Sequence, residues 1–284
     1  MTVTLLGAAE IRALAADLDV TPTKKLGQNF VVDANTVRKI VHVARVTDAD
    51  RVVEIGPGLG SLTLAILETG APVTAVEIDH RLAERLPATA GAHGVPAGAL
   101  TVVDADALRV TALPGDPNVL VANLPYNVSV PVLLHFLETF PGLQRGVVMV
   151  QAEVGERLAA APGSKIYGAP SVKAAWYGPW RLAGTVSRQV FWPVPNVDSV
   201  LVGFERDETP RGTDAERRRV FSIVDAAFGQ RRKMLRQSLA GAVAESAAAA
   251  SEVLTAAGVD PTARAEQLTV DDFVRIAAQV PVAP

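Results

Sequence analysis

The four consecutive residues Asn123, Leu124, Pro125 and Tyr126 combine hydrogen-bond acceptors with an aromatic ring. The exocyclic amine of adenine is a poor nucleophile because its lone pair is delocalised into the base. The Asn123 side-chain carbonyl and the Leu124 or Pro125 backbone carbonyl could each accept one N–H of such an amine, which would direct the lone pair toward a methyl donor. Pro125 would fix the turn, and Tyr126 would offer a face on which a base stacks. In isolation the tetrapeptide is more typical of a turn with a capping Asn and a core Tyr. A catalytic role is therefore favoured only if other motifs in the chain indicate a cofactor site.

A glycine-rich turn and two later acids indicate a cofactor site. The turn, residues 54–60, follows a β-branched run and carries Gly56 and Gly58 in the spacing G-x-G-x-G. A dinucleotide site would show G-x-G-x-x-G, which cradles a pyrophosphate. Glu77 lies 21 residues after Gly56, where it can accept from ribose hydroxyls, and Asp106 is placed to accept from an adenine amine. This pattern predicts S-adenosylmethionine, which has a ribose and an amino-acid tail but no pyrophosphate.

The composition excludes other kinds of site. The 284 residues include no cysteine, which excludes disulfides and thiolate chemistry, and the four histidines lack metal-ligand spacing, so no metal is expected. No signal peptide and no apolar run of ~18 residues are present; a soluble, cytoplasmic protein without a membrane partner is expected. The net charge of −3 argues against a nucleic-acid partner, but residues 211–236 hold eight basic residues against three acids. A basic surface is therefore expected on an acidic protein.

Short apolar runs alternate with stretches of helical periodicity through the first 151 residues. This alternation is typical of parallel βαβ units, so the sequence predicts an α/β, Rossmann-like fold with a mostly parallel, doubly wound sheet. An additional helix is expected over residues 8–18. The expected strands are 51–55, 73–78, 100–103, 118–121 and 145–151, and the expected helices between them are 35–44, 61–68, 81–86 and 130–138.

The pattern changes in the second half of the chain. Three apolar runs, 172–177, 182–191 and 197–204, lie close together, as in terminal antiparallel strands. Residues 208–213 contain Pro and Gly and are expected to be a linker, and residues 214–279 are alanine-rich and helical. Two domains are therefore predicted: an N-terminal methyltransferase domain, 1–207, and a small all-α domain, 208–284. The resemblance described next implies that the second domain binds RNA or the ribosome.

Taken together, the motifs resemble those of the rRNA adenine N6,N6-dimethyltransferases, and within them the branch that acts in bacterial small-subunit assembly. The resemblance runs from about residue 20 to 240. It implies S-adenosylmethionine-dependent dimethylation of two adjacent adenosines in a hairpin near the 3′ end of 16S rRNA, by a monomer acting on an immature 30S subunit. The matching segments are 24–31 (KKLGQNFV), 54–60 (EIGPGLG), 106–108 (DAL), 123–126 (NLPY), 167–168 with 171–172, 191–199 (FWPVPNVDS) and 228–235 (FGQRRKML).

The resemblance also implies roles for individual residues. Phe191 would face Tyr126 across a flipped adenine, although a core phenylalanine fixed beside prolines is an equal alternative. Asn196 stands where lysine is usual, which removes one phosphate contact. The implied cofactor-binding residues are Gln28, Asn29, Val31, Gly56, Gly58, Glu77, Ile78, Asp106, Ala107 and Asn123, and the implied RNA-binding residues are Lys24, Lys25, Arg231, Arg232, Lys233 and Arg236.

Three other readings stay open at this point. An antibiotic-resistance branch of the same family modifies an adenine of large-subunit rRNA, but segment 228–235 and the alanine-rich tail favour the assembly branch. A non-catalytic assembly factor could bind the immature subunit, but the intact tetrapeptide and glycine turn favour catalysis. An NAD-dependent dehydrogenase is disfavoured by the glycine spacing.

Overall fold

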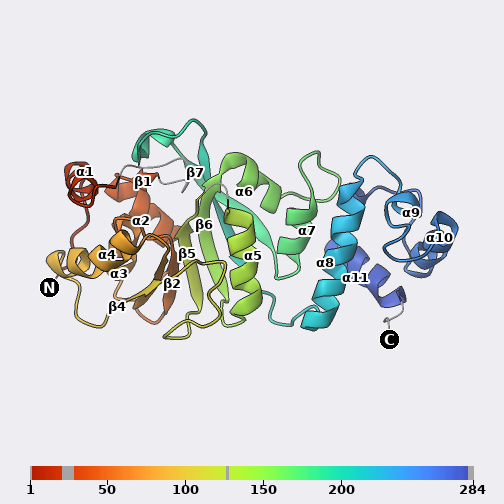
Figure 1. The fold of residues 1–284 in the computed structure, drawn as a ribbon, viewed down its shortest axis with the longest axis horizontal. Coiled ribbons are helices and arrows are strands. Elements are labelled where there is room, and N and C mark those ends of the chain that lie inside the picture. Colours follow the sequence, from red (N-terminus) through yellow and green to blue (C-terminus); the bar gives the residue numbers. More distant parts are fainter. Residues whose placement is uncertain (1, 21–28, 126–127, 281–284) are drawn as a thin grey trace. The chain divides into compact units, whose positions relative to one another are not determined.

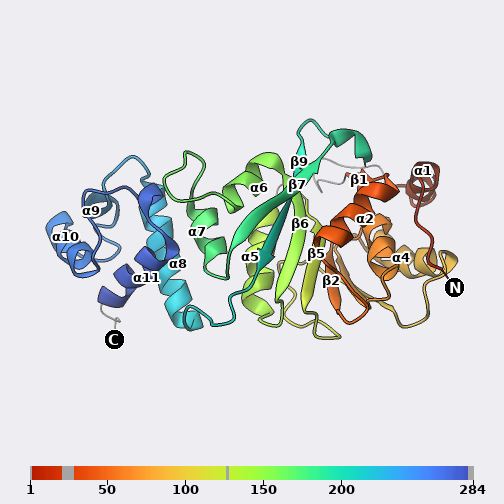
Figure 2. The ribbon, with the colours of Figure 1, turned by 180° about the vertical axis from the view of Figure 1, so that it is seen from behind.

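The structure, a computed structural model, describes residues 2–20, 29–125 and 128–280 (Figures 1 and 2). It divides into two compact units, of which the first comprises residues 1–155 and 181–206 and the second 156–180 and 207–284. The expected single boundary after residue 207 differs from this division, because residues 156–180 group with the C-terminal helices. Each unit is described by itself below.

The first unit is built on a seven-stranded sheet with the order β4-β3-β2-β5-β6-β9-β7. The five strands from β4 to β6 pair in parallel, and β9 runs antiparallel to β6. The order reverses between β2 and β5, which is the doubly wound arrangement that the sequence predicted. The strands are β2 (Val52–Ile55), β3 (Val73–Glu77), β4 (Leu100–Asp104), β5 (Val119–Asn123), β6 (Arg145–Gln151), β7 (Trp180–Val186) and β9 (Ser199–Glu205).

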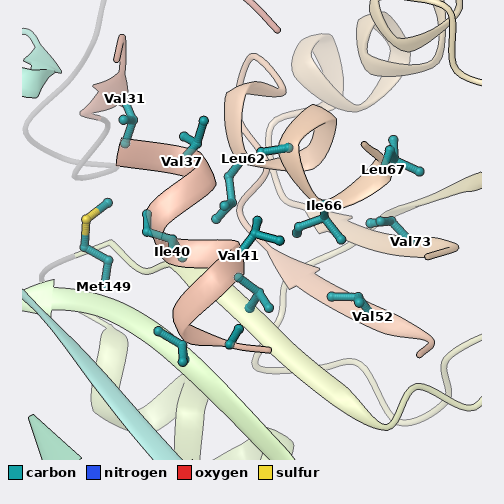
Figure 3. Packing of buried hydrophobic residues seen from close by; sticks show 14 of the residues in the cluster. Val31, Val37, Ile40, Val41, Val52, Leu62, Ile66, Leu67, Val73 and Met149 are labelled. Carbon is teal, nitrogen blue, oxygen red and sulfur yellow. The ribbon is translucent and has the colours of Figure 1, made fainter. Parts of the chain in front are cut away.

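Helices cover both faces of this sheet: α5 lies over it in Figure 1, and α2 lies over it in the view from behind in Figure 2. Helix α2 begins where the Asp33 carboxylate accepts the Thr36 backbone N–H at 2.7 Å. Its buried Val37, Ile40 and Val41 pack with α3 against β2 and β3 (Figure 3). The helices are α1 (Ala8–Asp17), α2 (Ala34–Val43), α3 (Ser61–Leu67), α4 (His80–Ala92) and α5 (Ser129–Thr139), and α6 (Ala152–Leu158) leads out of the unit.

A separate two-stranded ribbon joins two distant segments of the first unit. Strands β1 (Phe30–Val31) and β8 (Phe191–Trp192) pair antiparallel, with Phe30 opposite Trp192 and Val31 opposite Phe191. The Phe30 and Trp192 rings stack with their centroids 6.3 Å apart. The ribbon thereby joins residues 30–31 to residues 191–192, which include Phe191.

The three apolar runs after residue 170 were predicted as antiparallel strands, and the structure confirms this prediction only in part. Run 197–204 is strand β9, antiparallel to β6 as expected. Run 182–191 is divided into β7, a 3-10 turn (Arg188–Val190) and β8. Run 172–177 was wrongly predicted as a strand and lies mostly in helix α7 (Ala169–Ala175), because Pro170 in the first turn and the alanines favour a helix.

The second unit is helical. Helix α8 begins at a capping box in which Thr213 and Glu216 exchange hydrogen bonds, and α11 begins at the same arrangement of Thr269 and Asp272. Gly258, with φ +69°, follows the end of α10. This confirms the helical prediction for residues 214–279. The elements are α7, α8 (Asp214–Gly229), α9 (Leu235–Ser238), α10 (Ala247–Ala256), a 3-10 turn (Ala265–Gln267) and α11 (Val270–Gln279).

Within the described ranges, none of the helices has both the length and the apolar character needed to cross a bilayer. The same residues contain no cluster of three or more His, Asp or Glu side chains that could hold a metal ion.

Candidate active site

A cavity of about 260 Å³ opens in the first unit where β2, β3 and β5 end. The carboxyl ends of parallel strands meet at one edge of a doubly wound sheet, and the change of strand order between β2 and β5 opens a crevice there. The cavity gathers most of the residues that the sequence singled out. Those that line it are Asn29, Val31, Gly56, Gly58, Glu77, Ile78, Asp106, Ala107, Asn123, Leu124 and Pro125.

Four of the expected site residues lie outside the part of the chain that the structure describes: Lys24, Lys25, Gln28 and Tyr126. Phe191 is described, but it is not brought to the cavity. Its side chain is 2% exposed and belongs to the hydrophobic core with Val31 and Val186. Of the two positions considered for Phe191, beside a flipped adenine or within the core, the structure shows the core position.

The glycine-rich turn packs against Phe30 in the two-stranded ribbon of β1 and β8. Gly58 has φ +58°, a conformation that side-chain-bearing residues rarely adopt, and a Cβ atom there would lie 2.9 Å from the Phe30 ring. The backbone N–H of Gly56 donates to the Val76 carbonyl at 2.9 Å. Phe30 therefore fixes the turn from one side and β3 from the other. Phe30 was not expected to shape the site, although its neighbours in the segment 24–31 were.

Glu77 organises the opposite wall of the cavity. Its Oε2 accepts the Gly58 N–H at 3.0 Å, and its Oε1 accepts the N–H groups of Ile78 and Asp79, each at 2.9 Å. Burial raises the pKa of Glu77, and these three hydrogen bonds oppose the rise. An ionised carboxylate has about four acceptor positions. Glu77 can therefore hold the turn and still accept from a ligand hydroxyl.

Glu54 is the second buried carboxyl of the cavity. From the sequence it was expected only as the first residue of the glycine-rich turn. It is 1% exposed, and burial raises its pKa to about 8; the Thr63 hydroxyl offsets part of this rise, and the charge of Glu77 adds to it. Its Oε2 has no hydrogen-bond partner among the described residues. A carboxyl within an otherwise apolar strand is the signal that could have pointed to it.

These features fit the expected cofactor. Two buried carboxyls with raised pKa favour a ligand that brings positive charge or hydrogen-bond donors, and S-adenosylmethionine carries a sulfonium, an ammonium and two ribose hydroxyls. Asp106 lines the cavity with its Oδ1 accepting the Leu108 N–H at 2.9 Å. Ile78 and Leu108, exposed by 57% and 39%, add apolar surface to the lining, as a flat base would require.

Asn123 ends β5 with a fixed side-chain orientation. Its Nδ2 donates to the Asn29 backbone carbonyl at 3.2 Å, which leaves Oδ1 as the acceptor of the amide. The next residue, Leu124, is held by its N–H to the Met149 carbonyl at 3.0 Å. The backbone that carries the two proposed acceptors is thus tied to β6 and to the segment before β1.

Of the basic residues expected to bind RNA, those that the structure describes lie in the second unit. Arg232 and Lys233 are exposed and Arg236 is half-buried. Arg231 differs from them, because its Nε lies 2.9 Å from Glu266 Oε2.

The buried Glu54 carboxyl predicts an unusual pH dependence of stability. Its pKa is about 8 in the folded protein and 4.5 without burial, so its contribution is complete below pH 4.5 and is lost as the pH rises toward 8. Relative to the wild type, the free energy of unfolding of Glu54→Gln should therefore increase by roughly 1 kcal/mol per pH unit between about pH 5 and 8. Urea unfolding without added cofactor measures this. As a control, Glu245→Gln at an exposed position should show the same dependence of unfolding free energy on pH as the wild type. If Glu54→Gln also showed the wild-type dependence, the raised pKa of Glu54 would be contradicted.

Comparison with known proteins agrees with this geometry. The model of the family described as "Ribosomal RNA adenine dimethylase" matches residues 21–280. The chain is 69% identical over 277 residues to a protein of Leifsonia xyli subsp. xyli named "Ribosomal RNA small subunit methyltransferase A", covering 97% of this chain and 98% of that protein. It is 61% identical to the protein of the same name from Streptomyces coelicolor, covering 96% of each.

Solved structures show the same fold. A dimethyladenosine transferase from Plasmodium falciparum superposes with a TM-score of 0.73 at 23% identity, covering 86% of this chain and 94% of the other. The 23S rRNA methyltransferase ErmE gives a TM-score of 0.66 at 25% identity, covering 88% and 99%. The chain belongs to the ribosomal RNA adenine dimethylase family and is an S-adenosylmethionine-dependent rRNA adenine dimethyltransferase.

Proposed function

We propose that this enzyme dimethylates N6 of two adjacent adenosines in a hairpin near the 3′ end of 16S rRNA, during late assembly of the 30S subunit. The name shared by the relatives, one of which is 69% identical over nearly the whole chain, refers to the small subunit. The observation that carries the chemistry is the fixed Asn123 amide at the end of β5, beside a cavity with two buried carboxyls.

The proposed chemistry uses acceptors rather than a strong base. Asn123 Oδ1 and the backbone carbonyl of Leu124 or Pro125 each accept one N–H of the target amine, so that its lone pair points toward the methyl group. S-adenosylmethionine supplies that methyl group as an electrophile. The amine loses its proton after the attack, when it is strongly acidic. Tyr126 would stack on the flipped base.

The cofactor is assigned to the residues around the glycine turn. Glu77 accepts from the ribose hydroxyls with its remaining lone pairs, and Asp106 accepts from the adenine amine. Ile78 and Ala107 lie against the base, in keeping with their places in the lining. The turn with Gly56 and Gly58, together with Gln28, Asn29 and Val31, completes the binding residues.

The proposed partner is the 16S rRNA within an immature 30S subunit. Lys24, Lys25 and the cluster 231–236 would contact phosphates, and the helical second unit would carry most of this binding. A cytoplasmic monomer is proposed, in keeping with what the family resemblance implies.

Mapping of blocked adenosines tests this proposal. Dimethylated adenosines stop primer extension, so rRNA from cells with the gene should show two adjacent stops near the 3′ end of 16S rRNA that are missing without it. A stop in large-subunit rRNA instead would show the activity of the antibiotic-resistance branch. Purified enzyme should methylate immature subunits better than naked 16S rRNA, and equal rates would contradict the role of the assembly context.

A further inference from the structure

Residues 2–20, here called the N-terminal segment, precede every motif on which the family resemblance rests. They nevertheless pack against a wall of the cofactor cavity. Within the first unit they share one hydrophobic cluster with Phe30, Leu59 and Leu82, and these three residues line the cavity. The N-terminal segment therefore supports this wall from behind. The buried side chains that it contributes are Val3, Leu6, Ile11, Leu14, Ala15 and Val20.

Helix α4 holds the N-terminal segment at two places. Where α4 ends, His93 Nε2 lies 3.0 Å from Glu10 Oε1, and His93 Nδ1 lies 2.9 Å from the Thr4 hydroxyl oxygen. The Thr4 N–H also donates to the His93 carbonyl at 3.0 Å. In both views the stretch before α1 accordingly lies beside the end of α4 (Figures 1 and 2). The second attachment is made by Arg81, in the first turn of α4.

Arg81 uses all three nitrogens of its guanidinium in a bridge. Its Nε and Nη2 donate to the two carboxylate oxygens of Asp79, at 3.2 and 2.9 Å. Its Nη1 donates to the Asp19 carbonyl at 3.0 Å. Asp19 lies just beyond the end of α1 and has φ +49°, a conformation in which many helices end. The forked guanidinium thus joins the end of α1 to the start of α4.

Asp79 continues this bridge to the proposed ribose site. Its side chain is only 8% exposed, and its backbone N–H donates to Glu77 Oε1 at 2.9 Å. Burial is the main cause of the raised pKa of Glu77, and the negative charge of Asp79 adds to the rise. Arg81 balances that charge. The end of α1 is therefore connected to the Glu77 carboxylate through Arg81 and Asp79.

We propose that Arg81 is a positioning residue that couples the docking of the N-terminal segment to the binding of S-adenosylmethionine. Arg81 holds Asp79 where its N–H aligns Glu77, and this bridge is complete only while the end of α1 is docked. Such coupling is reciprocal: the docked segment strengthens cofactor binding, and bound cofactor stabilises the docked segment. The inference rests on the proposed function, because it takes Glu77 as the acceptor of the ribose hydroxyls.

Two observations distinguish this bridge from a surface ion pair, which usually contributes little to stability. The Asp79 carboxylate is nearly buried, and the third guanidinium nitrogen contacts a different segment of the chain. The backbone N–H of Arg81 also donates to Asp79 at 3.1 Å and so caps α4. A side-chain substitution of Arg81 keeps this backbone cap, so it removes the bridge without removing the start of the helix.

The first test measures cofactor affinity by titration calorimetry on the full chain. Arg81→Gln should weaken the binding of S-adenosylmethionine about tenfold. Its KM for the cofactor should rise while kcat at saturation stays unchanged, because Arg81 does not act on the target amine. Arg81→Lys keeps the charge beside Asp79 but cannot span both contacts, so its affinity should lie closer to that of Arg81→Gln than to the wild type.

A matched control lies one turn further along the same helix. Arg85→Gln removes an exposed cation of α4 and should bind the cofactor like the wild type. Glu10→Gln weakens the other attachment of the N-terminal segment without touching Asp79, and it should also keep the wild-type affinity. Wild-type affinity of Arg81→Gln or Arg81→Lys would overturn the proposal. An equal loss in Glu10→Gln would do the same, because general loosening would then explain the effect.

The second test measures the reciprocal effect, which a merely structural ion pair would not produce. In the wild type, saturating S-adenosylmethionine should slow the hydrogen exchange of the backbone amides of residues 11–20 severalfold. In Arg81→Gln at saturating cofactor this slowing should be lost, while the amides of residues 61–67, in the helix that follows the glycine turn, stay protected. Exchange of residues 11–20 that does not respond to cofactor in the wild type would refute the coupling without any variant. Equal slowing in Arg81→Gln would refute the role of Arg81.

Failure of the proposed cofactor site would give a different result. In that case Glu77→Ala would bind S-adenosylmethionine like the wild type, whatever the Arg81 variants do. If Glu77→Ala binds weakly and Arg81→Gln binds like the wild type, only the inference fails.

Discussion

Replacement of Asn123 by alanine is expected to lower methyl transfer by about a hundred- to a thousandfold, while the affinity for S-adenosylmethionine changes little. The substitution removes one of the two acceptors that localise the lone pair of the target amine, and comparable single hydrogen-bond partners of a transition state have effects of this size. Single-turnover methylation of immature subunits measures the chemical step, and calorimetry measures the cofactor affinity.

Two further variants make this prediction sharp. Asn123→Asp keeps an acceptor but loses the N–H that donates to Asn29, so it should retain more activity than alanine without reaching the wild type. Asn35→Ala, at an exposed position on α2, is the control for a simple loss of an asparagine and should be fully active. Near-normal turnover by Asn123→Ala would remove the amine-polarising role.

Replacement of Glu77 by alanine should have the second large effect, a loss of cofactor affinity of about a hundredfold, or about 3 kcal/mol. The change removes the acceptor of the ribose hydroxyls. It also leaves the N–H groups of Gly58, Ile78 and Asp79 without the carboxylate that aligns them. Titration calorimetry on the purified protein gives the affinity.

The control for Glu77 lies on the next helix. Glu84 is 70% exposed and outside the cavity, so Glu84→Ala should bind cofactor like the wild type. Glu77→Gln places an amide NH₂ against backbone donors on one side and should fall between wild type and alanine. Unchanged binding by Glu77→Ala would exclude this residue from the ribose site.

Much of the fold could be read from the sequence because the central parallel strands are buried on both sides. The β2 residues are all buried, and such continuous β-branched runs between helical stretches have few other structures available. The run 172–177 was misread, since apolar content alone does not separate a buried strand from a buried helix. The grouping of residues 156–180 with the second unit depends on tertiary contacts that no local pattern reveals.

The site was predictable where a residue's position along the chain determines its position in space. Glu77 ends β3 and Asn123 ends β5, the two parallel strands on either side of β2, so both had to lie at the same edge of the sheet. The contact between Phe30 and Gly58 and the pairing of Arg231 with Glu266 join segments 28 and 35 residues apart. Such contacts leave no spacing signature, which is why Arg231 was grouped with its exposed neighbours.

The buried Glu54 carboxyl has a consequence for ligand binding. With a pKa of about 8, it holds a proton in the interior of the cofactor-free enzyme at neutral pH. Binding of a positively charged ligand beside it favours the ionised form and so releases that proton to the buffer. Occupancy of the cavity is then linked to proton concentration: in a mildly acidic cell the same amount of cofactor would fill fewer enzyme molecules.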